Sequence, residues 1–335
     1  MPALYLTEQG AVLRRTGERL VVTKDHQVVD EVPIIHVDQV VVVGNIQLTT
    51  PAVALLLQKD IDVVFLSSHG RFRGRLMTTG SRFAQLRHRQ LRLMDDEAAS
   101  LGIARAIVLG KLGNQQALLR QQEGQGVNGA VAFLEQAIAQ AGKAQSVDSL
   151  RGVEGSAGAR YFAVLKALIP PEWGFTKRVY HPPTDPANAL LSFGYTLLLK
   201  DVSAAIQLVG LDPYLGFFHA IDYGRPSLAL DAMEEFRPLV DGLVLRLIGQ
   251  GEITPGDFQS RRRDKAVLLT DEARKGFVKA YEAQVNAPTT YAPRKEQTSY
   301  RRCIELQVRQ LARLVLGKQK TFRPFKEEPP GRRPG

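Results

Sequence analysis

The sequence predicts an α+β fold, in which a small N-terminal antiparallel β-sandwich precedes a larger, mostly α-helical domain. Short β-branched runs fill the first eighty or so residues, and from about residue 82 the apolar residues recur at helical spacing almost to the end. A chain of 335 residues exceeds the size at which a single core keeps growing, which favours two domains. We therefore expect a β domain at 1–82, a helical domain at 83–317 and a disordered basic tail at 318–335.

The strands of the N-terminal domain are expected in short runs separated by turn residues. Glu-Gln-Gly, Thr-Gly-Glu and Lys-Asp-His supply the turn chemistry between them. Thr50 and Pro51 then suit the N-cap and first position of a short helix that ends near residue 59. The expected strands are 4–6, 11–15, 20–23, 28–35, 40–43 and 62–66.

Three further helix starts are visible in the second part of the chain. Ser149 can cap a helix that runs through Glu154 to residue 168, and Asp185 with Pro186 can begin another toward residue 209. Ser227, after Pro226, can begin a third. The last eighteen residues combine Pro, Gly and charge without apolar periodicity, which predicts disorder.

The composition limits the class of protein and its partners. Lys and Arg number 44 against 34 Asp and Glu, and this net charge of +10 favours a polyanionic partner such as nucleic acid or an acidic membrane surface. The single cysteine, Cys303, excludes a disulfide framework and fits a reducing compartment. The N-terminus lacks a signal-peptide pattern, and no apolar run approaches the roughly 20 residues that span a bilayer. We expect a cytoplasmic protein with no membrane partner.

Basic residues gather where a polyanion could bind. Arg71, Arg73 and Arg75 alternate along a probable strand, and a second group follows with no acidic residue inside it. Each residue alone is equally well explained as solvated surface charge. Taken together, they predict phosphate contacts. The expected nucleic-acid-binding residues are Arg82, Arg87, Arg89, Arg92, Arg178, Arg261, Arg262 and Arg263.

One histidine and several carboxylates have the composition of a site for a hard divalent metal. His219 lies upstream of Asp231 and Glu234, which are three residues apart on an expected helix, and Glu154 stands at the head of a run of tiny residues. The run of tiny residues would allow Glu154 to pack close to another helix. Such a site typically acts on phosphate.

Each of these residues also has a structural explanation. Glu154 could form a salt bridge with Arg151 or Arg160, and His219 could be a hydrogen-bonded structural residue. Asp231 and Glu234 share a polar stripe with Asp241 that is typical of a solvated helix face, and Glu234 has the spacing of an ion pair with Arg237. The residues alone leave both explanations open.

Several catalytic motifs are absent from the sequence. It contains no G-x-x-x-x-G-K-[ST] loop, no G-x-G-x-x-G after an expected strand, no G-x-S-x-G elbow and no H-E-x-x-H helix. Nothing in the sequence therefore supports a nucleotide-fuelled motor, a dinucleotide enzyme, a serine hydrolase or a zinc protease. We expect no nucleotide cofactor.

Four ordered segments resemble the CRISPR-associated integrase family, the metal-dependent DNA endonucleases and integrases that capture new spacers. The first is Glu154-Gly155 followed by Ala157 and Tyr161-Phe162. The others are DPANALLSFGYTLL at 185–198, GLDPYLGFFH at 210–219 and RPSLALDAMEEFRP at 225–238. The resemblance covers most of the chain.

The resemblance implies a function and a site. It implies insertion of short DNA fragments into a CRISPR repeat array by transesterification, at an Mg²⁺ or Mn²⁺ ion held by Glu154, His219 and Glu234. Asp231 would be an additional acidic catalytic residue. Many relatives have Asp where this chain has Glu234, which makes the coordination distance there less certain. The resemblance also implies double-stranded DNA as substrate, a homodimer, and a small ferredoxin-like second CRISPR-associated protein as partner.

Two other functions fit the same sequence. A non-catalytic DNA-binding subunit would keep the fold, but the complete set of Glu154, His219 and Glu234 argues against it. A transposon-encoded integrase of the same fold would act on the ends of its own element. Neighbouring genes would separate this second alternative from a CRISPR function.

Overall fold

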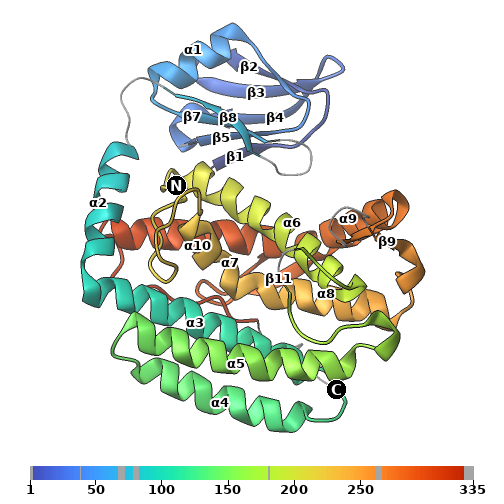
Figure 1. The fold of residues 1–335 in the computed structure, drawn as a ribbon. Helices are drawn as coiled ribbons and strands as arrows, with labels where there is room; N and C mark the ends of the chain where they lie inside the picture. The colour runs from blue at the N-terminus through green and yellow to red at the C-terminus, as the bar shows by residue number, and fades with distance from the viewer. Residues whose placement is uncertain are drawn as a thin grey trace, which may run out of the picture. The chain divides into compact units, whose positions relative to one another are not determined.

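The structure is a computed structural model that describes residues 3–37, 39–66, 72–77, 83–179, 182–260 and 266–327. The chain divides into two compact units, Met1–Arg87 and His88–Gly335. We expected the boundary after residue 82, whereas the two units divide after Arg87, five residues later. The division falls inside helix α2 (Phe83–Asp95). The elements of each unit are labelled in Figure 1.

The described residues of unit 1 form two four-stranded sheets. One has the order β1-β5-β7-β8 and the other the order β4-β3-β2-β6. β1 and β7 both pair parallel to β5, and β6 pairs parallel to β2, whereas the remaining neighbours are antiparallel. The strands are β1 (Ala3–Leu6), β2 (Val12–Thr16), β3 (Arg19–Lys24), β4 (Gln27–Pro33), β5 (Gln39–Val43), β6 (Gln47–Leu48), β7 (Asp62–Leu66) and β8 (Phe72–Leu76).

The expected strands are therefore present, but the wholly antiparallel pairing was wrong. Helix α1 (Thr50–Gln58) lies between β6 and β7 in the chain and supplies the crossover that a parallel β5–β7 pair requires. Its N-cap is Thr49, one residue before the expected Thr50. Apolar side chains of both sheets and of α1 share one core, which includes Leu13, Val40 and Leu55.

Unit 2 is mostly helical, which confirms the α+β class. Figure 1 shows α3, α4 and α5 running alongside one another, and all three pack in pairs. The helices are α2, α3 (Glu97–Leu119), α4 (Val127–Lys143), α5 (Val147–Leu168), α6 (Pro186–Val209), α7 (Ser227–Met233), α8 (Arg237–Gly249), α9 (Asp271–Asn286) and α10 (Tyr300–Val315). Four 3-10 turns occur in the described chain: η1 (Ile34–His36) in unit 1, and η2 (Pro171–Trp173), η3 (Glu234–Phe236) and η4 (Pro255–Asp257) in unit 2.

Two short antiparallel strand pairs occur among the described residues of the helical part, and they were not expected from the sequence. They pair β9 (Phe258–Ser260) with β10 (Val267–Leu269), and β11 (Pro288–Tyr291) with β12 (Glu296–Ser299). Strands of three or four residues are too short to show a reliable period in the sequence.

The helix starts show which N-caps could be predicted from the local sequence. Asp185 caps α6 as expected, because its side chain accepts a hydrogen bond from the backbone N–H of Asn188. α5 begins earlier than expected, because its N-cap is Ser146 and not Ser149. The backbone N–H of Ser149 donates a hydrogen bond to the Ser146 hydroxyl. α6 is long and apolar enough to cross a membrane by length and composition, but 61% of its most apolar stretch is buried inside the protein, as in a core helix.

The segment after α10 differs from the expected disordered tail. Residues 321–327, which we call the C-terminal strap, lie against the helical unit, and the Phe325 side chain is only 2% exposed. The Phe325 ring stacks on Phe236 with centroids 4.7 Å apart. Asn114 donates a hydrogen bond to the Phe325 carbonyl, and the Glu327 N–H donates to Asn114. Residues 328–335 lie outside the described part of the chain.

Candidate active site

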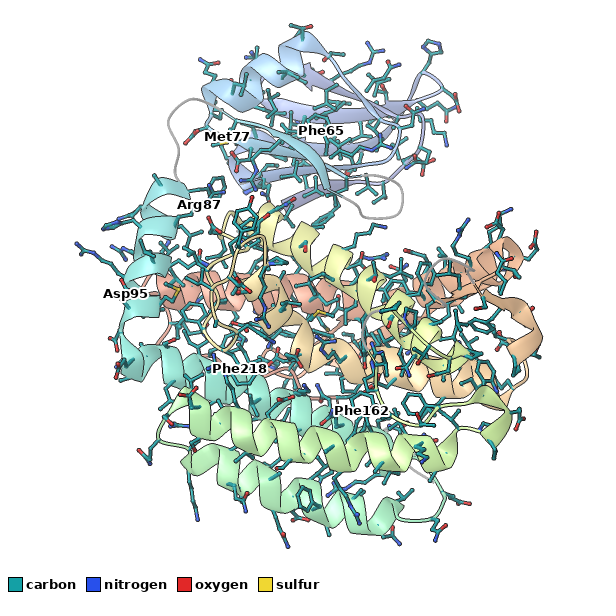
Figure 2. All side chains as sticks on the ribbon, in the orientation of Figure 1. Phe65, Met77, Arg87, Asp95, Phe162 and Phe218 are labelled. Carbon is teal, nitrogen blue, oxygen red and sulfur yellow. The ribbon has the colours of Figure 1, made fainter. Side chains whose placement is uncertain are left out.

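A pocket of about 350 Å³ in unit 2 brings Glu154, His219 and Glu234 together. Glu154 comes from α5, Glu234 from η3, and His219 from the loop between α6 and α7. Phe162 and Phe218, both labelled in Figure 2, line the same pocket. The residues therefore meet from elements far apart in the sequence, as the metal-site hypothesis requires.

Glu154 is paired with a residue that sequence reasoning did not consider. Its Oε1 accepts a hydrogen bond from the Lys111 ammonium of α3, whereas Arg151 donates to Asp148 and to the Phe218 carbonyl. The salt bridges to Arg151 or Arg160 that the sequence allowed are therefore not the ones formed.

The run of tiny residues after Glu154 does not all serve close packing. Ala157 is fully buried, but Gly155 and Gly158 face open space, since a methyl group at either would meet nothing within 4 Å. The position of Glu154 therefore depends on its pairing with Lys111 more than on a glycine-lined helix contact.

Glu234 is a buried, charged carboxylate with two cationic neighbours. Its Oε1 accepts a hydrogen bond of 2.8 Å from Arg237 Nε, which confirms the ion pair expected from their spacing, and its Oε2 lies 2.5 Å from Lys111 Nζ. Burial by itself raises the pKa of Glu234, but Arg237 and Lys111 outweigh burial and lower the pKa to about 2. Glu234 is consequently ionised at neutral pH.

Lys111 is charged as well, although it is mostly buried. Burial lowers the pKa of the Lys111 ammonium, but Glu234 and Glu154 outweigh this and raise the pKa above its ordinary value. The cluster therefore contains two carboxylates with one ammonium between them.

The solvated helix face proposed for the acidic stripe was wrong. Asp231, Glu234 and Asp241 are each at most 3% exposed. α7 also ends at Met233 and a 3-10 turn follows, so Asp231 and Glu234 do not lie on one regular helix.

Asp231 organises the loop that carries His219. Its Oδ2 accepts hydrogen bonds from the backbone N–H groups of Phe217 and Phe218, and its Oδ1 accepts from the N–H of His219. His219 Nδ1 lies 2.7 Å from the same Oδ1. Both oxygens of Asp231 accept backbone N–H groups, so the contact with Nδ1 suits the His219 tautomer that leaves the Nε2 lone pair for a metal.

Gly216 makes this arrangement possible. A methyl group at position 216 would lie 2.8 Å from the Ser227 backbone and 2.9 Å from Asp231 Oδ2. Only glycine lets the loop approach α7 closely enough for the three N–H groups to reach Asp231.

Asp241 lines the pocket and is held by two tyrosines. Tyr161 and Tyr195 donate hydrogen bonds of 2.8 and 2.5 Å to its two oxygens. Burial raises the pKa of Asp241 to about 6 despite these donors and the nearby arginines. Asp241 belongs to the packing around the site, and sequence reasoning had placed it on the solvated face.

Within the described residues, no three His, Cys, Asp or Glu side chains are grouped closely enough to form a ready metal site. The reason is visible in the contacts, because Lys111 lies between Glu154 and Glu234 and Asp231 is used by the His219 loop. The residues nonetheless fit a hard metal. Gln115 Oε1 is buried at the pocket without a hydrogen-bond partner, and Glu234 Oε2 faces the Lys111 ammonium. Carboxylate oxygens with one imidazole suit Mg²⁺ or Mn²⁺.

The predicted DNA-contact arginines fall into three groups. Arg87, Arg89 and Arg92 are exposed on α2, although Arg89 also donates to the Leu316 carbonyl after α10. Arg178 donates to Asn188 and Ser192 of α6. Arg82, Arg261, Arg262 and Arg263 lie outside the described residues, as does Arg71 of the strand group. Their contact with DNA stays a prediction.

Sequence reasoning missed Lys111 and Gln115, which line the pocket from α3. The run KLGNQQALLR at 111–120 contains a usable signal. Asn114 and Gln115 follow Lys111 at three- and four-residue spacing and so share its side of the helix. Polar residues on a helix face that must be buried need partners, so this stripe marks a contact with other polar groups.

Comparisons with known proteins identify the family of the chain. Residues 4–283 match the family model described as CRISPR associated protein Cas1. The chain is 37% identical over 327 residues to a CRISPR-associated exonuclease Cas4/endonuclease Cas1 fusion from Geobacter sulfurreducens, which covers 94% of this chain but 58% of the fusion. It is 35% identical to CRISPR-associated endonuclease Cas1 3 from Thermus thermophilus, with 96% of both chains covered.

A solved structure is similar over the whole chain. A chain of a partial Cas6-RT-Cas1–Cas2 complex superposes with a TM-score of 0.80 at 26% identity, covering 98% of this chain and 99% of that one.

Proposed function

This chain belongs to the Cas1 family of CRISPR-associated proteins, and from that premise we propose that it is a metal-dependent DNA endonuclease and integrase. It inserts short DNA fragments into a CRISPR repeat array. The observation that carries the proposal is the meeting of Glu154, His219 and Glu234 at one pocket that also holds Lys111, Arg225 and Arg237. Carboxylates with an imidazole suit a hard metal, and the cations suit a phosphate backbone.

Glu154, His219 and Glu234 would hold an Mg²⁺ or Mn²⁺ ion. The bound ion would polarise the phosphoryl group and stabilise the charge on the attacking or leaving oxygen. Asp231 fixes the tautomer and orientation of His219 through the Nδ1 contact of 2.7 Å. Asp231 therefore acts on the site through His219.

The chain's own residues account for substrate binding at the pocket. Arg225 and Arg237 supply guanidinium donors that match phosphate oxygens, and Arg237 is held in place by Glu234 and by the Tyr195 ring 4.7 Å away. Transesterification forms one phosphodiester bond and breaks another, so it needs no nucleotide cofactor.

The larger assembly follows from the same premise. Double-stranded DNA is the substrate, Arg87, Arg89 and Arg92 of α2 contact its phosphates, and the protein acts as a homodimer with a Cas2-type partner. The similar chain found within a Cas1–Cas2 complex supports such a partner. The net charge of +10 supports DNA.

The transposon alternative is less well supported. A relative named as a CRISPR-associated endonuclease aligns over 96% of both chains, which favours a repeat array as the target. A repeat array and a small partner gene beside this gene would support the proposal, and terminal inverted repeats would support the transposon.

The direct test is a strand-transfer assay with the purified chain, labelled duplex fragments and a plasmid that bears the repeat. We expect transfer in Mn²⁺ and none in EDTA. Glu154→Ala and His219→Ala should each abolish transfer, whereas Glu123→Ala, at an exposed position, should not. Transfer at the wild-type rate by either pocket variant would refute the ligand assignment.

A further inference from the structure

The ammonium of Lys111 occupies the space between two of the proposed metal ligands. Its Nζ donates to Glu154 Oε1 and lies 2.5 Å from Glu234 Oε2, and the Lys111 side chain is 12% exposed. The side chain comes from α3, so the contact joins α3, α5 and η3. Lys111 thus contacts the oxygens that a metal ion would use.

The two carboxylates need a cation in this position. The side chains of Glu154 and Glu234 are 22% and 4% exposed, and two like charges in a poorly solvated pocket repel. Arg237 Nε donates to the other oxygen of Glu234, Oε1. Without Lys111, the buried Oε2 of Glu234 would lose the cation that lies 2.5 Å from it.

The contact with Glu234 is an ion pair. Oε2 lies 2.5 Å from the ammonium, and the charge of Lys111 helps to lower the pKa of Glu234. Lysine has a flexible four-carbon stem, and the adjoining pocket of about 350 Å³ leaves room for its head group to move.

We propose that Lys111 is a tethered cation that holds Glu154 and Glu234 together before metal binds and that the metal displaces. The inference rests on the ligand set of the proposed function. An ammonium and a divalent ion cannot use the same lone pairs at once, so the two compete. Lys111 therefore stabilises the metal-free protein and lowers the apparent affinity for metal.

Two substitutions with opposite expected effects test the competition. Lys111→Met keeps the length of the side chain and removes the charge, and it should bind Mn²⁺ at least about tenfold more tightly than wild type. Lys111→Arg keeps the charge and offers a fork that can bridge both carboxylates, so it should bind Mn²⁺ more weakly. Isothermal titration of the full chain with Mn²⁺, without DNA, measures both.

Thermal unfolding supplies a second measurement. In EDTA, Lys111→Met should melt below wild type, because the carboxylates lack a cation, and saturating Mn²⁺ should restore its melting temperature to that of wild type. Lys166→Met, at an exposed position on α5, is the matched control and should change neither affinity nor melting.

The outcomes separate this inference from the proposed function. If Glu234→Gln loses Mn²⁺ binding but Lys111→Met binds as wild type does or more weakly, the metal site stands and the competition is refuted. Should Lys111→Met fail to fold, unchanged or tighter binding by Lys111→Arg refutes it equally. If wild type and all variants bind no Mn²⁺, or Glu154→Gln and Glu234→Gln bind as wild type does, the ligand set itself is wrong and the inference falls with it.

Discussion

Glu234 and Glu235 are neighbours in the chain and almost fully buried, yet their carboxyl groups lie in opposite surroundings. Glu234 faces Arg237 and Lys111, and their charges lower its pKa to about 2 in spite of burial. Glu235 receives hydrogen bonds from the Gln307 side chain and the Phe325 N–H, which are neutral donors, and burial raises its pKa to about 8.

The difference shows how one turn of 3-10 helix serves two purposes. On one side, charged partners keep a carboxylate ionised beside the pocket, as a metal ligand must be. On the other side, amides and backbone hold a carboxyl group that anchors the C-terminal strap. Gly110 of α3 allows this second contact, because a methyl group there would lie 2.7 Å from Glu235 Oε1.

The contrast between Glu234 and Glu235 is tested with the largest expected effect by replacing each carboxyl group with an amide. Glu234→Gln removes a charged metal ligand, and we expect strand transfer to fall at least about a thousandfold, equivalent to about 4 kcal/mol of transition-state stabilisation. Glu235→Gln should keep transfer within about threefold, since its carboxyl group does not face the pocket. Transfer rates and Mn²⁺ titrations of both variants measure this, and equal losses would show that the two sides of the turn are not independent.

The strap side can be tested through Phe325. Phe325→Ala removes the ring stacked on Phe236 and should lower the free energy of unfolding of unit 2 by about 3 kcal/mol, while Mn²⁺ binding stays unchanged. Urea unfolding followed by the fluorescence of the single tryptophan, Trp173, reports on this unit. Phe133→Ala, at an exposed site on α4, is the control, and a similar small effect for both would show that the strap contributes no stability.

A substitution of Asp231 tests the pocket side of the turn with a smaller expected loss of activity. Asp231→Asn places an amide NH₂ among N–H donors and disturbs the orientation of His219, so we expect metal affinity and transfer to fall by about 10- to 100-fold, less than for Glu234→Gln. Asp222→Asn, on the exposed part of the same loop, is the control. If Asp231→Asn is inactive while Glu234→Gln retains strong activity at saturating metal, Asp231 is the direct ligand.

A third buried carboxyl group, Asp241, predicts a pH effect. Its folded-state pKa of about 6 exceeds the unfolded value of 3.8, so the stability it contributes is complete below about pH 4 and is lost as pH rises through 6. Relative to Asp241→Asn, wild type should therefore lose about 1 kcal/mol of unfolding free energy between pH 5 and pH 7. Asp148→Asn, at an exposed position, should show no such difference. A difference that does not change with pH would mean that Asp241 keeps an ordinary pKa.

The candidate site was only partly accessible from the sequence. The motifs that contain Glu154, His219 and Glu234 pointed to residues that line one pocket, because each motif is local and the resemblance links them. The residue between two of them was missed. Lys111 is 43 positions from Glu154 in the chain, and no short-range pattern connects the two.

The sequence by itself determined the features that depend on residues close together in the chain. The strands of unit 1, the cap of α6 at Asp185 and the Glu234–Arg237 ion pair each follow from residues within a few positions, where backbone hydrogen bonds and side-chain spacing decide the outcome. The tertiary structure alone decided the parallel strand pairs, the place of Lys111 and the order of the strap. In the strap, Asn114 bonds to a residue 211 positions away. Such contacts form because buried polar groups need hydrogen-bond partners, and the fold supplies these partners from distant parts of the chain. No short-range sequence pattern indicates which distant residues will meet.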